Sequence, residues 1–346
     1  MTFHLLSIVY NNPELNYHTY NTMDTKRKVS ACIIAYNIEN FIADCIEGAL
    51  SQKLDNPYEI VIQEDCSTDR TREIVLEYQR KYPDKIRAIL NEKNIGQAEN
   101  FLRSIEACEG DYIAFCDGDD VWTDPLKIKL QLEEMGKHPE CDMCFHPSTI
   151  QYMIRKGNSP MKAYHGDSVK IFDTKKSILV GGSLSPTSSL VFRKSVITAL
   201  RKFTVKYDLS LGGDSDDFIE IFGSLHGGLL YLPRCMAVYR FEVPGSWSDK
   251  DRKFENSVRG TRTRTYMLSK LNEYLDYKYS KEIQYKITLT HYTLWRRFMK
   301  VDKKTLDDYK KTREEVYSLP IDKKILARIL FKSLKRKLKS FFSLLK

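Results

Sequence analysis

The residues best suited to chemistry lie in FCDGDDVWTDP at residues 115–125, where Asp117, Asp119 and Asp120 place three carboxylates within four positions. The stretch follows an apolar run, so the carboxylates are expected on a turn beyond a buried strand. Mg²⁺ or Mn²⁺ would relieve their mutual repulsion, because such hard cations bind carboxylate oxygens and take further ligands from phosphate and water. Gly118 would allow the tight turn. The simpler alternative is a solvated acidic turn before a helix, since Asp favours both places.

A second acidic cluster, QEDCSTD at residues 63–69, also follows an apolar run. The Asp65 carboxylate could accept a hydrogen bond from a base N–H such as the imide of uracil. The alternative is a turn into the next helix, which Ser67 and Thr68 would serve equally well. Both interpretations can hold for different residues of the turn.

Four apolar runs that alternate with helical periodicity position these clusters. They predict strands over 29–37, 58–63, 86–90 and 111–116. A helix with apolar residues at helical spacing is expected after each strand. These helices are expected in residues 37–52, in the residues that follow a Thr68 cap, in residues 98–108, and from Asp124–Pro125 to about residue 135. This order predicts an α/β, Rossmann-like fold with a mostly parallel sheet flanked by helices. Ligands bind at the carboxyl ends of such strands, so both acidic clusters should share one edge of the sheet.

The remaining chain predicts a four-part organisation. A more irregular segment, about 142–189, precedes two further strands at 188–193 and 227–232, with an acidic helix start at 212–222 between them. From about residue 248 the pattern is polar and helical. We therefore expect an N-terminal extension over residues 1–28 and a main α/β domain over 29–247. A helical C-terminal region over 248–320 and a basic amphipathic helix over 321–346 should follow.

The net charge of +9 is concentrated at the C-terminus. Residues 322–346 hold nine Lys or Arg and one Asp, which gives +8 and leaves about +1 for the other 321 residues. A near-neutral body argues against nucleic acid as a partner. No run reaches the roughly 18–20 apolar residues of a membrane span. The eight cysteines, without a secretory signal ahead of them, predict reduced thiols in the cytoplasm.

The C-terminal helix also predicts a partner. Its Leu, Ile and Phe residues form one stripe among the basic residues, a pattern typical of helices that lie on an anionic membrane surface. The alternative is a helix whose apolar stripe docks on the protein body. We favour the membrane, which predicts a peripheral protein at the inner face of the cytoplasmic membrane.

Several stretches together resemble the family 2 glycosyltransferases, which have the GT-A fold. They are VSACIIAYN, EIVIQEDCSTDRT, NEKNIGQAEN, GDYIAFCDGDDVWTDPLKIKLQ, SSLVFR and GDSDDFIEIF with GGLLYLPRCMAVYR, within residues 29–245. The resemblance implies a nucleotide-sugar donor, most often a UDP-sugar, and metal-dependent transfer with inversion to a glycan or lipid-linked acceptor. It also suggests the synthesis of a bacterial capsule, O-antigen or exopolysaccharide.

The resemblance also implies roles for individual residues. The donor nucleotide would be bound by Ala35, Tyr36, Glu39, Asp65, Asp117 and Gly118. Asp117 and Asp119 match the family's D-x-D motif, with Asp119 the first choice as direct ligand of Mn²⁺ or Mg²⁺ and Asp120 the second. Asp214 matches the carboxylate that acts as general base on the acceptor hydroxyl.

The sequence departs from the family at both ends of the expected site. Glu64 and Cys66 stand where the family usually has Asp and commonly has Gly, and Gly213 replaces the acidic residue that usually precedes the base. Because Asp216 and Asp217 lie within one helical turn of Asp214, the base could be any of the three. The alternatives for the whole chain are a related transferase with a different donor and a catalytically inactive carbohydrate-binding or scaffold protein.

Overall fold

The computed structural model describes residues 26–154, 160–209, 215–243 and 254–298, together with Ile325 and Ala327. Asp214 and nearly all of the expected basic C-terminal helix therefore lie outside the described residues. None of the helices in these ranges is long and apolar enough to cross a membrane.

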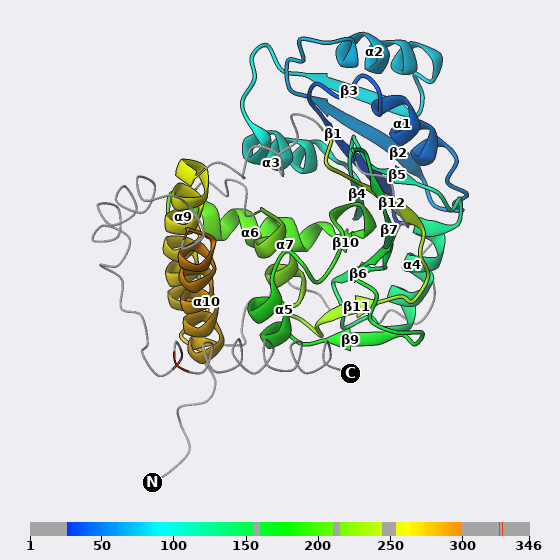
Figure 1. Cartoon of the computed structure of the whole chain (residues 1–346). Coiled ribbons are helices and arrows are strands. Elements are labelled where there is room, and N and C mark those ends of the chain that lie inside the picture. Colours follow the sequence, from blue (N-terminus) through cyan, green and yellow to red (C-terminus); the bar gives the residue numbers. More distant parts are fainter. Residues whose placement is uncertain are drawn as a thin grey trace, which may run out of the picture.

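The first half of the chain forms the predicted parallel layer (Figure 1). Its strands run side by side in the order β3-β2-β1-β4, with bounds β1 Val29–Ala35, β2 Tyr58–Glu64, β3 Ile86–Leu90 and β4 Tyr112–Asp117. The pairs β1–β2, β1–β4 and β2–β3 are all parallel. The connecting helices are α1 Ile42–Leu50, α2 Thr71–Lys81 and α3 Gln97–Ala107. The predicted α/β alternation is confirmed.

The second half extends this sheet to eight strands, in the order β3-β2-β1-β4-β10-β6-β11-β9. The added strands are β6 Met143–Phe145, β9 Lys170–Phe172, β10 Val191–Arg193 and β11 Leu229–Tyr231. Strand β10 runs antiparallel between β4 and β6, so the sheet is mixed but mainly parallel. The helices of this part are α4 Lys127–Lys137, α5 Thr174–Val180, α6 Lys194–Lys206 and α7 Ser215–Gly223.

A second sheet of four strands was not predicted. It has the order β5-β12-β7-β8, with bounds β5 Val121–Trp122, β7 Ser148–Tyr152, β8 Met161–Lys162 and β12 Ala237–Phe241. The segment 142–189, expected to be irregular, thus contains strands of both sheets and α5. Strands of two to five residues are too short to show a clear alternation of apolar and polar residues, which explains the error.

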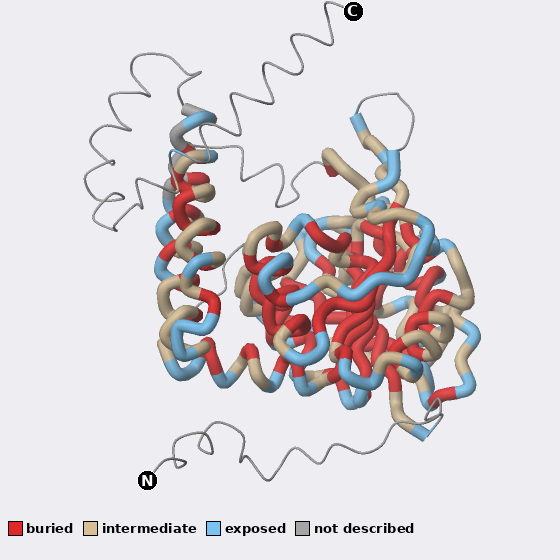
Figure 2. Tube along the Cα trace, turned by 90° about the horizontal axis from the view of Figure 1, so that it is seen from below, coloured by how far each residue is buried: buried red, intermediate tan, exposed pale blue. Residues whose placement is uncertain are grey.

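Two apolar layers cover the two faces of the large sheet. On β1, Ala31 and Ile33 belong to the layer that includes α1 and α4, whereas Cys32 belongs to the layer that includes α3, α6 and α7. The second layer also takes in the C-terminal helices α9 Phe254–Tyr274 and α10 Ser280–Phe298. Figure 2 shows buried residues throughout the sheet and along these helices. The C-terminal helices therefore share the core of the α/β domain.

Two helices begin later than the sequence suggested. The N-cap of α2 is Arg70, so the prediction that Thr68 caps this helix is wrong; the Asp69 carboxylate instead accepts a hydrogen bond from the Thr71 N–H at 2.9 Å. Helix α4 begins after Leu126, and the Asp124 carboxylate accepts from the Leu126 N–H at 2.9 Å. In both cases an aspartate stabilises the turn just before the helix.

Candidate active site

The carboxyl ends of three neighbouring strands bring the predicted residues to one edge. The strand register pairs Ala35 with Glu64, and Ile34 with Asp117. Because β1, β2 and β4 are parallel, the turns that follow them leave the sheet on the same side. The prediction that the two acidic clusters share an edge is confirmed.

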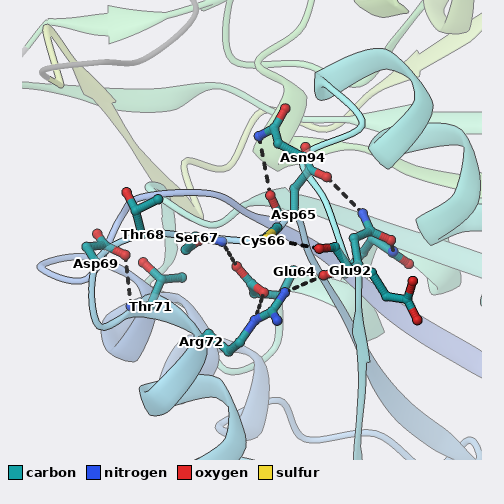
Figure 3. A network of polar contacts seen from close by, with 12 residues as sticks. Glu64, Asp65, Cys66, Ser67, Thr68, Asp69, Thr71, Arg72, Glu92 and Asn94 are labelled. Carbon is teal, nitrogen blue, oxygen red and sulfur yellow. Dashed lines mark hydrogen bonds and ion pairs between the residues drawn. The ribbon is translucent and has the colours of Figure 1, made fainter.

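The turn after β2 is built around two buried carboxylates (Figure 3). Asp65 accepts hydrogen bonds from Asn91 Nδ2 at 2.8 Å, from the Ile95 N–H at 2.9 Å and from the Gly96 N–H at 3.0 Å. A carboxylate has about four lone-pair positions, so roughly one remains for a ligand. Asp65 thus holds the loop that precedes α3, a role the sequence did not indicate, and its contact with a base stays a prediction.

Glu64 fixes the same turn from the other side. Its carboxylate accepts from the Ser67 N–H at 2.6 Å and from Arg72 Nε at 2.5 Å, and it is fully buried. Arg72 in turn donates to the Asn91 carbonyl at 2.6 Å. The glutamate that departs from the family pattern is therefore held by α2 and is not available to a ligand.

The loops after β1 and β2 interlock through hydrogen bonds in both directions. The Asn37 side chain accepts from the Thr68 N–H at 2.8 Å, and the Asn37 N–H donates to Ser67 Oγ at 3.0 Å. The Glu39 carboxylate accepts from the Arg70 N–H at 2.9 Å. Glu39 thus aligns the two loops, and an additional role toward a nucleotide stays a prediction.

The exposure of the first two predicted nucleotide contacts differs sharply. Ala35 is buried at the end of β1, whereas the next residue, Tyr36, is 36% exposed. Tyr36 therefore offers a partly exposed aromatic surface beside the Asp65 turn, while Ala35 contributes backbone: its carbonyl accepts from the Asp65 N–H at 2.9 Å.

The acidic turn after β4 is tight and closely packed. The Asp120 N–H donates to the Asp117 carbonyl at 2.9 Å, and the Gly118 N–H donates to the Ile34 carbonyl at 3.0 Å. A side chain at position 118 would place its Cβ 2.5 Å from Ile38 Cδ1 and 2.6 Å from the Ile34 oxygen. Gly118 is therefore needed for close packing of the turn on β1.

The three carboxylates of this turn are short of compensating charge. Burial raises the pKa of Asp117 well above its usual value, and the neighbouring carboxylates Asp119 and Asp120 add to the effect. Burial, followed by the charge of Asp119, raises the pKa of Asp120 to about 8. Asp120 Oδ1 accepts from the Arg240 N–H at 2.9 Å; Oδ2 is buried and accepts no hydrogen bond among the described residues, although the nearby Ser188 hydroxyl lowers the pKa of Asp120.

These features fit a divalent cation. A buried, unpartnered carboxylate oxygen beside two further carboxylates is a position where a cation would relieve repulsion. No three His, Cys, Asp or Glu side chains within the described ranges converge as a complete metal site. One or two carboxylates with phosphate and water are nevertheless the usual ligands of protein-bound Mg²⁺.

Two cations from the second sheet lie near the acidic turn, and neither was predicted from the sequence. Arg240 on β12 donates to the Asp119 carbonyl at 3.2 Å and to the Asp44 carboxylate at 2.5 Å. Lys162 on β8 lies over the ring of Tyr239, with its Nζ 3.8 Å from the ring centroid. The positive charge of Lys162 acts against the raised pKa of Asp117. Both strands are too short to be recognised from sequence.

The acidic start of α7 supplies the opposite wall. Asp216 receives a hydrogen bond from Thr187 Oγ1 at 3.2 Å. Burial raises the pKa of Asp216, and the charge of Asp216 in turn raises the pKa of Asp117. Asp217 belongs to a different environment, near Arg264 and Lys286 of the C-terminal helices. Of the two described candidates for the base, Asp216 is therefore the one whose charge acts on the acidic turn.

Glu220 holds the loop that carries Thr187. The Glu220 side chain is buried and accepts from the N–H of Ser185 at 2.9 Å and from its hydroxyl at 2.7 Å. Burial raises the pKa of Glu220 to about 8. The first turns of α7 thus combine one carboxylate toward the site with two that anchor the surrounding structure.

Comparison with known proteins shows which sequences this chain resembles. The family model described as "Glycosyl transferase family 2" matches residues 30–198. The uncharacterized protein Rv1520 of Mycobacterium tuberculosis is 32% identical over 223 residues, which cover 63% of this chain and 60% of that protein. A Bacillus subtilis protein provisionally assigned as the teichuronic acid biosynthesis glycosyltransferase TuaG is 32% identical over 157 residues, or 45% of this chain and 60% of TuaG. The chain thus spans about 60% of the length of these relatives.

Solved structures show the same fold. The crystal structure of S. aureus TarS 1-349 in complex with UDP matches with a TM-score of 0.58 and 17% identity, over 82% of this chain and 78% of TarS 1-349. The complex of the same protein with UDP-GlcNAc matches with a TM-score of 0.57 and 16% identity, over 80% of this chain and 74% of that one. At this level of identity the likeness shows the fold alone.

Proposed function

Since the match over residues 30–198 makes this chain a family 2 glycosyltransferase, we propose that it transfers a sugar from a UDP-sugar to a hydroxyl of a glycan or lipid-linked acceptor. The transfer inverts the anomeric carbon and contributes to a bacterial surface polysaccharide. The carrying observation is the acidic turn of Asp117, Asp119 and Asp120, in which Asp120 is buried with one unpartnered oxygen and the charge of Asp216 acts on Asp117. The name of TuaG supports the polysaccharide context.

In this proposal the edge of the sheet binds the donor. The exposed ring of Tyr36 lines the nucleoside, and the remaining acceptor position of Asp65 receives the base N–H. Ala35, Glu39 and Gly118 shape this surface through the backbone and loop contacts described above.

Asp119, with Asp117 and Asp120, would hold Mn²⁺ or Mg²⁺. Such a cation, when bound, neutralises the charge that develops on the departing diphosphate. The Arg240 backbone and guanidinium keep the turn in place, and the Lys162 ammonium contributes further positive charge toward its carboxylates.

Asp216 is the proposed general base, in place of Asp214. As the acceptor oxygen forms its bond to the anomeric carbon, the bond from that carbon to the diphosphate breaks and the hydroxyl proton passes to the Asp216 carboxylate. Attack from the side opposite the leaving group inverts the configuration. The position of Asp216 on the wall facing the acidic turn supports this assignment. Asp214 lies outside the described residues, so we carry it forward as the second candidate.

The acceptor side and the location of the protein are parts of the same proposal. The net +8 of residues 322–346 supports binding to an anionic membrane at the cytoplasmic face, at about 1 kcal/mol for each basic residue near the surface. A lipid-linked acceptor would be presented there. The near-neutral remainder of the chain gives no support to nucleic acid as a partner.

The decisive experiment measures release of UDP from UDP-sugars, beginning with UDP-GlcNAc, with Mn²⁺, Mg²⁺ or EDTA. We expect turnover that requires a divalent cation, and we expect Asp119→Asn and Asp120→Asn to reduce it at least a hundredfold. Asp84→Asn, which changes an exposed carboxylate between α2 and β3, is the matched control and should behave as the wild type. A protein that neither releases nor binds any nucleotide would indicate the inactive binding or scaffold role instead.

A further inference from the structure

The C-terminal helices pack directly against the helix that carries the proposed base. Figure 1 shows α9 and α10 side by side, next to α5, α6 and α7. Their apolar residues, which include Leu268, Leu271 and Ile283, belong to the same buried cluster as Phe218 and Phe222 of α7. A change in the position of α9 or α10 would therefore change the packing of α7.

One carboxylate at the start of α7 forms a polar link across this interface. Asp217 is buried, and its Oδ2 lies 3.4 Å from Arg264 Nε of α9 and 3.6 Å from Lys286 Nζ of α10. Lys286 is itself 7% exposed and donates to the carbonyl of Val180, the last residue of α5, at 3.0 Å. Lys286 thus joins the end of α5 to the beginning of α7.

The loop after α5 is shaped to accept this carboxylate. Gly181 and Gly182 have positive φ angles of +40° and +57°, which disfavour residues with a side chain. A Cβ at position 182 would lie 2.2 Å from Asp217 Oδ1. The two glycines therefore make room for Asp217 beside its cations, and the sequence pattern showed only a Gly/Ser-rich segment there.

The neighbouring residue, Asp216, belongs to the active-site wall. Successive residues of an α-helix point about 100° apart, so one carboxylate can face the site while the next faces the C-terminal helices. A buried charge held by two cations resists displacement, because an unpaired charge in that position is costly. Any shift of the first turn of α7 would move Asp216 relative to the acidic turn.

We propose that Lys286 and Arg264 are positioning residues: through Asp217 they fix the first turn of α7, and thereby hold Asp216 at the distance and angle that proton transfer requires. The inference rests on the proposed function. It makes the C-terminal helix pair a part of the active site's support.

The test compares Lys286→Met, which removes the charge but keeps the chain length, with Lys286→Arg. The assay is release of UDP with Mn²⁺, well below the unfolding temperature. We expect Lys286→Met to lower kcat about tenfold or more, with the KM for the UDP-sugar and the thermal stabilisation by UDP and Mn²⁺ within twofold of wild type. Lys286→Arg should restore most of kcat. Lys281→Met, an exposed lysine on the same helix, should match the wild type.

The double variant Asp217→Asn/Lys286→Met guards against misfolding, because it removes the buried carboxylate and its lysine together. It should fold and show the same kcat defect as either single change. A wild-type kcat in a folded Lys286→Met variant, or equal losses of kcat and donor affinity, would overturn the inference alone. A wild type that turns over no nucleotide-sugar would overturn the proposed function, and this inference with it.

Discussion

Replacing Glu220 by Gln tests how burial in helix α7 changes the ionisation of a carboxyl group. The Glu220 carboxyl is buried, with one oxygen bound to Ser185 and the other without a hydrogen-bond partner among the described residues. Burial raises its pKa from 4.5 to about 8, so at pH 7 the folded protein keeps a proton that the unfolded chain releases. Glutamine has nearly the same shape and cannot ionise.

The magnitude follows from linkage between protonation and folding. A carboxyl with a raised folded pKa stabilises the protein fully below its unfolded pKa, and this stability is lost as pH rises through the folded value. With values of 4.5 and about 8, the group lowers the free energy of unfolding by about 2 kcal/mol at pH 6 and by about 5 kcal/mol at pH 9. Between these two pH values the wild type should lose about 2–3 kcal/mol more than Glu220→Gln.

Urea unfolding at pH 6 and pH 9 measures this difference. The Gln amide leaves buried N–H donors unpaired. Apart from the effect of the carboxyl's ionisation, this should lower the free energy of unfolding of Glu220→Gln by about 1–2 kcal/mol. The pH-dependent difference between the proteins is independent of that offset. Glu77→Gln, an exposed change on α2, should follow the wild type at both pH values. Parallel pH dependence of wild type and Glu220→Gln would refute the reasoning.

Two further predictions concern the site. Asp216→Asn should reduce kcat for UDP release by about 10²–10⁴-fold while binding of UDP with Mn²⁺, followed by thermal stabilisation, is retained; a larger loss in Asp214→Asn than in Asp216→Asn would move the base to Asp214. Gly118→Ala should lower the free energy of unfolding by about 1–3 kcal/mol, because its Cβ would lie 2.5 Å from Ile38 Cδ1; an unchanged urea midpoint would show that the turn can shift at little cost.

The sequence allowed the first half of the fold to be predicted because its signals are local. The apolar runs before Asp65 and Asp117 are long enough to identify buried strands, and parallel topology then brings their carboxyl ends together. The internal contacts of Asp65 could not be predicted. They depend on N–H groups of Ile95 and Gly96, thirty residues further along the chain, whose direction only the folded loop determines.

The second half was predicted less well because its contacts are distant in sequence. Arg240 reaches the acidic turn from 120 residues away, through a strand of five residues in a sheet with no local signature. The choice between Asp216 and Asp217 depends on the rotation of α7 about its axis. That rotation is set by packing against α9 and α10, which a helical pattern alone does not specify.

The reciprocal hydrogen bonds between the Asn37–Glu39 segment and the Ser67–Arg70 segment have a consequence for protein engineering. Each loop supplies donors and acceptors that pair with the other loop in this structure. A chimaera that receives one of them from a homologue would leave the other with broken pairings. Attempts to alter nucleotide preference by grafting should therefore exchange both segments together.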